Sequence, residues 1–189
     1  MKTTFRKLLV ATAALTIAAG AASAQDISKF VLSDAAAKKT LIKNEINADT
    51  ARKIIDKCIE IATKENMPIT IFILSPTGQI VAAHRMDGQV PINIETALLK
   101  AQSVLVTRDS THLRANMIAN NMPQQLKWHA IGVFTTPGGL PIVAGGQMIG
   151  TIGIGGGSKD EEMAFEALEA VVGPQPPLAP TLPPAQPSR

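Results

Sequence analysis

The chain has 189 residues, with 18 lysines and arginines against 15 acidic residues, 3% aromatic residues and one cysteine. This length can bury a full core in one domain, and a single cysteine excludes an internal disulfide. The lack of a basic run and the scarcity of aromatic side chains exclude a nucleic-acid-binding surface, which needs positive charge and stacking.

The first 24 residues are predicted to be a signal peptide. Three basic residues precede an apolar run at residues 8–19, and residues 22–24 have the small side chains of a signal-peptidase site. The apolar run is too short to span a membrane comfortably. We therefore expect cleavage after Ala24 and a periplasmic or secreted mature protein, without stable membrane insertion. The mature chain would carry 15 basic and 15 acidic residues, so the excess positive charge belongs to the leader.

The mature domain begins with a predicted helix and a predicted hairpin. Asn47 is a candidate cap for a helix that reaches Lys64, and Cys58 on its apolar stripe is expected to pack in the core. Residues 69–74 are a β-favouring run too short for a helix. After the turn sequence SPTGQ, residues 80–86 are predicted to form the returning strand.

A second helix is predicted at residues 94–106. Leu99 and Val106 lie away from its main apolar face, so we expect burial on two sides, the second against another subunit. Residues 108–130 are polar and interrupted by Pro123, and we expect a short helix and a loop there.

The next segment is rich in glycine. Two β-type runs, LPIVA and QMIGTIGI, are joined by Gly145 and Gly146, a pair suited to a two-residue hairpin turn. The dinucleotide-binding pattern G-x-G-x-x-G fails because Ser158 takes the place of its third glycine, and the Walker order Gly-Lys-Ser is also absent. Strand glycines instead permit the close approach of a helix, another chain or a flat ligand.

The last part of the chain predicts a helix and a tail. Ser158 and Glu161 have the spacing of a capping box, which predicts a final helix to about Val172. Residues 173–189 contain seven prolines and are predicted to be a disordered tail. Residues 25–172 then form a single α+β domain, in which an antiparallel sheet built from hairpins is covered by helices in an α-β sandwich.

From Asn47 onward the sequence resembles the haem-degrading domain family, the haem-binding proteins of the GlcG/HbpS type. The resemblance rests on the helix beginning NADTARKIID, the strand ending HRMDG, the helix containing LLKAQ and the segment GGLPIVAGGQMIGTIGIGGGSKDEEMAFEAL. It implies a profilin-like sandwich, a homo-oligomer and haem binding, with haem degradation or redox sensing in some members. Arg85 matches the family's strand-end motif, Lys100 matches a lysine typical of the second helix, and Gly138 and Gly139 match the glycine-rich hairpin.

Haem iron would need an axial ligand from this chain. The chain contains no tyrosine, which leaves the three histidines, the methionines, the cysteine and weak oxygen ligands. His112 is the first candidate ligand of the metal and His84 the second. Arg85 and Lys100 are the candidate partners of the haem propionates.

The sequence leaves three functions open. The first is an exported haem-binding protein that sequesters haem, degrades it or senses redox conditions. The second is a periplasmic enzyme or binding protein for a small organic acid, in which Arg85 holds the anion and Lys100 or a histidine moves a proton. The third is a non-catalytic oligomeric interaction module, suggested by the two-sided apolar helix and the proline-rich tail.

Overall fold

The computed structural model describes residues 44–182, so the predicted signal peptide and the end of the tail lie outside the described residues. The elements are α2 (Ala48–Lys64), β1 (Thr70–Leu74), β2 (Ile80–Arg85), α3 (Pro91–Thr107), α4 (Thr111–Ile118), α5 (Met122–Ala130), β3 (Gly139–Ala144), β4 (Gln147–Gly155) and α6 (Asp160–Val171). No helix among these residues combines the length and the apolar character needed to cross a membrane.

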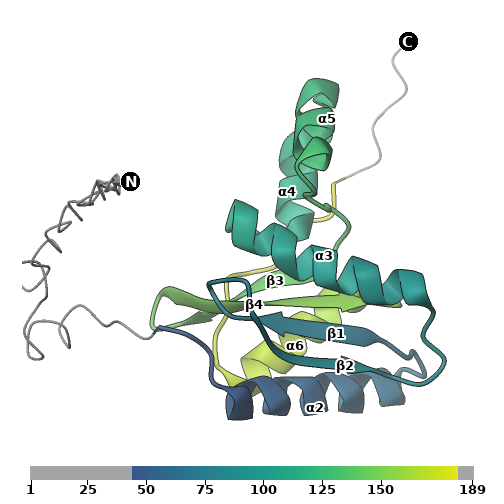
Figure 1. The fold of residues 1–189 in the computed structure, drawn as a ribbon, viewed down its shortest axis with the longest axis vertical. Helices are drawn as coiled ribbons and strands as arrows, with labels where there is room; N and C mark the ends of the chain where they lie inside the picture. Colours follow the sequence, from purple (N-terminus) through teal and green to yellow (C-terminus); the bar gives the residue numbers. More distant parts are fainter. Residues whose placement is uncertain (1–43, 183–189) are drawn as a thin grey trace, which may run out of the picture. The chain divides into compact units, whose positions relative to one another are not determined.

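The strands form one four-stranded sheet in the order β2-β1-β4-β3, and every neighbouring pair is antiparallel. Each outer strand is joined to its central neighbour in a hairpin, β1 with β2 and β3 with β4. Figure 1 shows α2 and α6 on one face of the sheet and α3 across the other face. The predicted α+β sandwich is therefore confirmed.

The hydrophobic core lies between the sheet and the layer formed by α2 and α6. Side chains at alternate positions of a strand share one face of a sheet. The core therefore combines Ile69, Ile71, Ile73, Ile152 and Ile154 from the sheet with Ile54, Cys58, Met163 and Leu168 from the two helices. Burial raises the pKa of the Cys58 thiol to about 12, so the thiol stays protonated and fills core volume as predicted.

Helix α3 lies directly against the backbone of β4. A Cβ atom on Gly153 would lie 2.6 Å from the amide nitrogen of Ala101, and one on Gly155 would lie 2.6 Å from the carbonyl oxygen of Asn93. The Thr151 hydroxyl donates a hydrogen bond to the Ala101 carbonyl at 3.0 Å. Of the three uses of strand glycines that the sequence left open, the structure shows the close approach of a helix.

Two helices differ from their predictions. Helix α3 begins at Pro91, earlier than expected, because proline is well suited to the first turn of a helix. Residues 122–130 form α5 rather than a loop, and Asn121 caps this helix by accepting a hydrogen bond from the Gln124 amide at 3.1 Å. Pro123 lies in the first turn of α5. Backbone N–H groups in a first turn have no hydrogen-bond acceptor within the helix, so proline, which lacks an N–H, is tolerated there.

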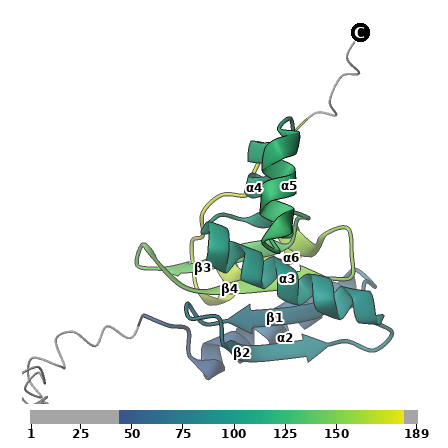
Figure 2. The same cartoon turned by 45° about the horizontal axis from the view of Figure 1, so that its top comes forward.

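Helices α4 and α5 project from the sandwich on its α3 side (Figures 1 and 2). Large apolar side chains are exposed on and beside them, namely Leu113, Met117, Met122, Leu126 and Ile131. Val106 of α3 is also 58% exposed. Leu99, the other residue on the second apolar side of α3, is half-buried. The described residues thus cover this side only in part, and the expected contact with another subunit stays a prediction.

The tail has no helix or strand in residues 174–182, in accord with its prolines. Its first residues nevertheless contact the domain, where the sequence predicted disorder. The Gln175 side chain bonds to the backbone of Val143 at the edge of the sheet, and Leu178 packs against the hydrophobic core.

Candidate functional site

The first turn of α6 places two carboxylates in the interior, contrary to the predicted capping box. Ser158 is exposed, and the helix begins at Asp160 without a side-chain cap. Asp160 and Glu161 are only 5% and 4% exposed. Asp160 accepts a hydrogen bond from the Gly157 amide at 2.9 Å, a backward bond to the loop before the helix of the kind expected from Glu161 to Ser158 in the capping box.

The first buried pair is Lys100 with Asp160. The Lys100 ammonium donates to Asp160 Oδ2 at 2.7 Å and to the Ile154 carbonyl at 2.7 Å, and Lys100 is 3% exposed. These contacts hold the Lys100 ammonium between α3, β4 and α6. Burial raises the pKa of Asp160, and the neighbouring Lys100 charge opposes that rise.

The second buried pair is His112 with Glu161. His112 Nδ1 lies 2.7 Å from Glu161 Oε2, and the side chains are 15% and 5% exposed. The other carboxylate oxygen, Glu161 Oε1, is buried without a hydrogen-bond partner among the described residues. Burial raises the pKa of Glu161, while the hydrogen bond from His112 lowers it by a smaller amount.

The hydrogen bond to Glu161 also fixes the orientation of the imidazole. When Nδ1 carries the proton and donates it to the carboxylate, Nε2 keeps a free lone pair. This is the arrangement in which histidine serves as a metal ligand, with a carboxylate holding the second ring nitrogen.

Gly138 and Gly139 lie between the two buried pairs. A Cβ atom on Gly138 would lie 2.9 Å from Lys100 Nζ, and one on Gly139 would lie 2.6 Å from Thr111 Cγ2. The Gly139 amide donates to the Thr111 hydroxyl at 3.0 Å, which ties β3 to the residue before His112. The structure thus brings four predicted site residues into one region, namely His112, Lys100, Gly138 and Gly139. We call this region, together with the two acids Asp160 and Glu161, the paired-acid site.

His84 and Arg85 lie elsewhere, on the edge strand β2. Both are exposed, and Arg85 donates to the Gln89 carbonyl at 3.0 Å. His84 lines a cavity of about 450 Å³ against α2, where Arg52 and Asp56 are its charged neighbours. The two residues that the sequence grouped with His112 and Lys100 are therefore not part of the paired-acid site.

A polar cavity of about 390 Å³ opens beside Lys100 and Asp160, with Asn93, Thr96 and Thr136 in its lining. Because Lys100 is already paired with a carboxylate, this cavity offers an incoming anion little net positive charge. Arg85 does not line it. Among residues 44–182, no three His, Cys, Asp or Glu side chains are grouped to hold a bare metal ion.

Several known proteins are similar to this chain. The family model described as "Haem degrading protein HbpS-like" matches residues 46–169. Protein GlcG of Escherichia coli strain K12 is 29% identical over 109 residues, covering 58% of this chain and 80% of GlcG. The crystal structure of HbpS gives a TM-score of 0.61 at 25% identity, covering 68% of this chain and 91% of HbpS. A PduOC:haem complex gives a TM-score of 0.62 at 24% identity, covering 67% of this chain and 95% of PduOC.

Proposed function

We propose that this chain, which belongs to the HbpS-like family of haem-degrading proteins, is an exported protein that binds haem through His112. The family and the haem complex of a protein with the same fold support haem as the ligand. The observation that carries the assignment to His112 is its hydrogen bond to the buried Glu161 carboxylate.

The chemistry of the His112–Glu161 pair fits an iron ligand. His112 would hold the haem iron through its Nε2 lone pair, and bound haem would supply iron redox chemistry. Glu161 would hold the ring orientation and raise the basicity of the imidazole. The exposed His84 side chain makes no hydrogen bond among the described residues, which is why His112 is preferred.

The candidate propionate partners, Arg85 and Lys100, both make other contacts within this chain. Lys100 is held by Asp160 and a carbonyl oxygen, and Arg85 lies on the distant edge strand β2. The proposal therefore assigns neither side chain to a propionate beside His112. Sequestration, degradation and redox sensing all begin with haem binding, and this proposal concerns that shared step.

A hemin titration of the purified mature protein tests the proposal. We expect a saturable Soret band in the wild type and its loss or a large blue shift in His112→Ala, with His84→Ala as the matched control that keeps the band. Glu161→Gln keeps a hydrogen-bonding side chain but removes the charge, and should weaken haem binding by about tenfold. A wild-type band unchanged in His112→Ala would refute the ligand assignment, and no saturable band would refute haem binding. Circular dichroism of each variant checks that it is folded.

Export is the second part of the proposal and rests on the N-terminal sequence pattern. Mass spectrometry of the protein from cells that express the full chain should find an N-terminus at Gln25. A chain that retains Met1 to Ala24 would contradict export by a cleaved signal peptide.

The small-acid alternative receives no support from the geometry, because Arg85 and Lys100 do not line one cavity.

A further inference from the structure

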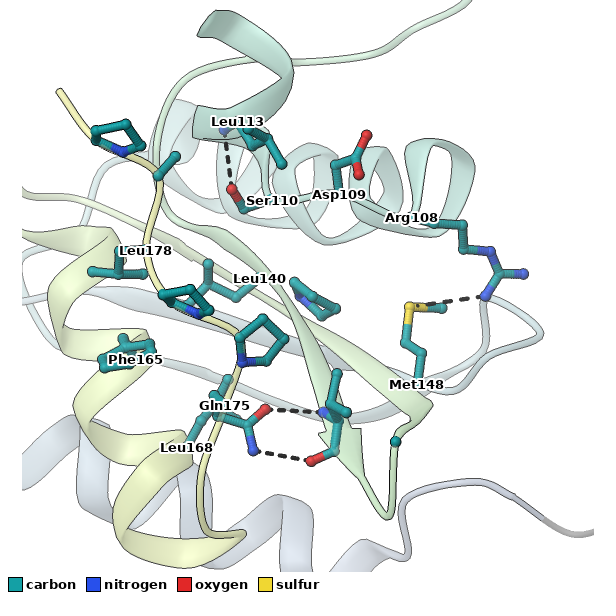
Figure 3. A pocket seen from close by; sticks show the side chains of 17 residues that line it. Arg108, Asp109, Ser110, Leu113, Leu140, Met148, Phe165, Leu168, Gln175 and Leu178 are labelled. Carbon is teal, nitrogen blue, oxygen red and sulfur yellow. Dashed lines mark hydrogen bonds between the residues drawn. The ribbon is translucent and has the colours of Figure 1, made fainter. Parts of the chain in front are cut away.

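A mainly apolar cavity lies beside the edge strand β3, between α4, α6 and the proline-rich tail. It has a volume of about 520 Å³, within the range of about 300 to 1,000 Å³ that is typical of small-molecule sites. Figure 3 shows it enclosed by side chains from all of these elements. Its apolar lining includes Leu113, Leu140, Phe165, Leu168 and Leu178. His112, Lys100 and Asp160 do not line it, so it is separate from the paired-acid site.

The tail forms the outer wall of this cavity and is held in place by hydrogen bonds. The Gln175 amide accepts from the Val143 N–H at 2.9 Å and donates to the Val143 carbonyl at 2.9 Å. Further along, Asn116 of α4 donates to the Pro180 carbonyl at 2.8 Å. Since prolines restrict the backbone between these two attachments, the wall is a stiff strap rather than a free chain.

One charged group at the cavity lacks a counter-charge. Asp109 lines the cavity but forms an ion pair with Arg114. Arg108 also lines it and makes no ion pair with a carboxylate among the described residues. Among residues 44–182 the exposed guanidinium makes one hydrogen bond, to the sulfur of Met148 at 3.8 Å (Figure 3).

Arg108 also has an unusual backbone. It ends α3 in the left-handed conformation, with φ +62°. Glycine is the usual residue at this position of a helix end, because a Cβ atom is disfavoured there. The backbone conformation therefore does not favour an arginine here, and glycine could replace it without strain.

We propose that this cavity binds an organic molecule with an apolar body and a single carboxylate, and that Arg108 pairs with the carboxylate. The apolar lining excludes water from the body of the ligand, and a guanidinium without a counter-ion favours an anion at the mouth. The strap of residues 175–180 would cover the ligand.

Calorimetric titration with decanoate and with 1-decanol tests the proposal on the full mature chain. These probes share an apolar chain and differ in charge. We expect wild type to bind decanoate about tenfold more tightly than 1-decanol, as for one charge-assisted hydrogen bond. Arg108→Gly should remove this preference while leaving 1-decanol binding unchanged.

Arg108→Gly is a favourable variant because glycine suits the left-handed backbone, so unfolding should not account for a loss of binding. Asn66→Gly is its matched control, since Asn66 is exposed and has φ +51° outside the cavity. Gln175→Ala should weaken both probes by detaching the strap, whereas Gln102→Ala, on an exposed side of α3, should change neither.

No binding of decanoate to the wild type, equal binding of the two probes, or unchanged preference in Arg108→Gly would each overturn the proposal. His112→Ala should bind decanoate as the wild type does. If it did not, the cavity and the paired-acid site would be one site, contrary to the proposal. Failure of haem binding would leave all of these expectations unchanged.

Discussion

Glu161 is the residue whose environment differs most from what its position in the sequence suggests. Near the start of a helix, an acidic side chain is expected to stabilise the helix dipole from the solvent. Here it is buried, with one oxygen bonded to His112 and the other without a partner among the described residues. A buried carboxylate with an unpaired oxygen lowers the stability of the fold when it is ionised. Its presence in Glu161 therefore points to a role other than stability.

The raised pKa of Glu161 predicts a specific pH dependence of stability. The folded protein holds the Glu161 proton at pH values where the unfolded chain, with an ordinary pKa of 4.5, has released it. The stabilisation is therefore full below pH 4.5 and is lost as the pH rises through the raised pKa. The free energy of unfolding of the wild type, measured in urea, should exceed that of Glu161→Gln by the largest amount in acid. This difference should fall as the pH rises.

Parallel stability curves for wild type and Glu161→Gln would contradict this prediction. Ser158→Ala is a control at the same helix start, because Ser158 makes no cap hydrogen bond. It should leave both the stability and its pH dependence as in the wild type, whereas loss of a true cap would cost about 1 kcal/mol.

At the scale of elements, the spacing between α3 and the sheet depends on glycine. Gly153 pairs with Phe72 of β1 on one side and with Gly139 of β3 on the other, in the centre of the sheet. The backbone of α3 occupies the volume that a side chain on Gly153 would need. Because helix backbone cannot move without its neighbours, this contact sets the position of Lys100 on α3 and so of the paired-acid site.

Gly153→Ala should destabilise the protein strongly, by about 3 kcal/mol or more, because the added methyl group meets the backbone of Ala97 and Ala101. Gly157→Ala is the matched control. There the added methyl group meets the flexible end of Met67, which can move aside, so the cost should be smaller. Chemical denaturation of both variants measures the difference, and equal costs would contradict a rigid contact between α3 and β4.

Local signals explain which elements the sequence predicted. Asn47 caps α2 through a hydrogen bond from the Thr50 amide at 2.8 Å, and Gly145 and Gly146 take the positive φ values that the hairpin turn needs. The prediction at Pro123 was wrong: a proline can begin a helix as well as interrupt one, and Pro123 lies in the first turn of α5.

The pairing within the candidate site was beyond the reach of such signals. Lys100 and Asp160 are 60 residues apart, and His112 and Glu161 are 49 residues apart. A pattern within one helix shows only that acidic residues suit its first turn. Which partner each acid meets depends on how α3, α4 and α6 pack around the sheet.

At the scale of the whole molecule, the projecting α4–α5 pair exposes apolar side chains that a water-facing helix pair does not need. Met122 and Leu126 are 62% and 64% exposed. We propose that this surface contacts a second copy of the chain, as the predicted homo-oligomer requires.

Light scattering after size exclusion should give the mature wild type a mass that is a multiple of the protomer mass. The double variant Met122→Glu with Leu126→Glu should shift it to the protomer mass, because burying the added charges would oppose association. Lys127→Glu, a charge change beside them at another exposed position, is the control and should keep the wild-type mass. A monomeric wild type at micromolar concentration would refute the self-contact.

The side chain of Gln175 has a further consequence for a sheet with an open edge. Strand β3 lies at the outer edge of the sheet, where backbone N–H and carbonyl groups could pair with a strand of another molecule. At Val143 both groups are already bonded to the Gln175 amide, which imitates one residue of a neighbouring strand. The two residues that follow, Pro176 and Pro177, lack the N–H groups needed to extend this pairing. The start of the tail thus shields the edge of the sheet from the intermolecular strand pairing that leads to aggregation.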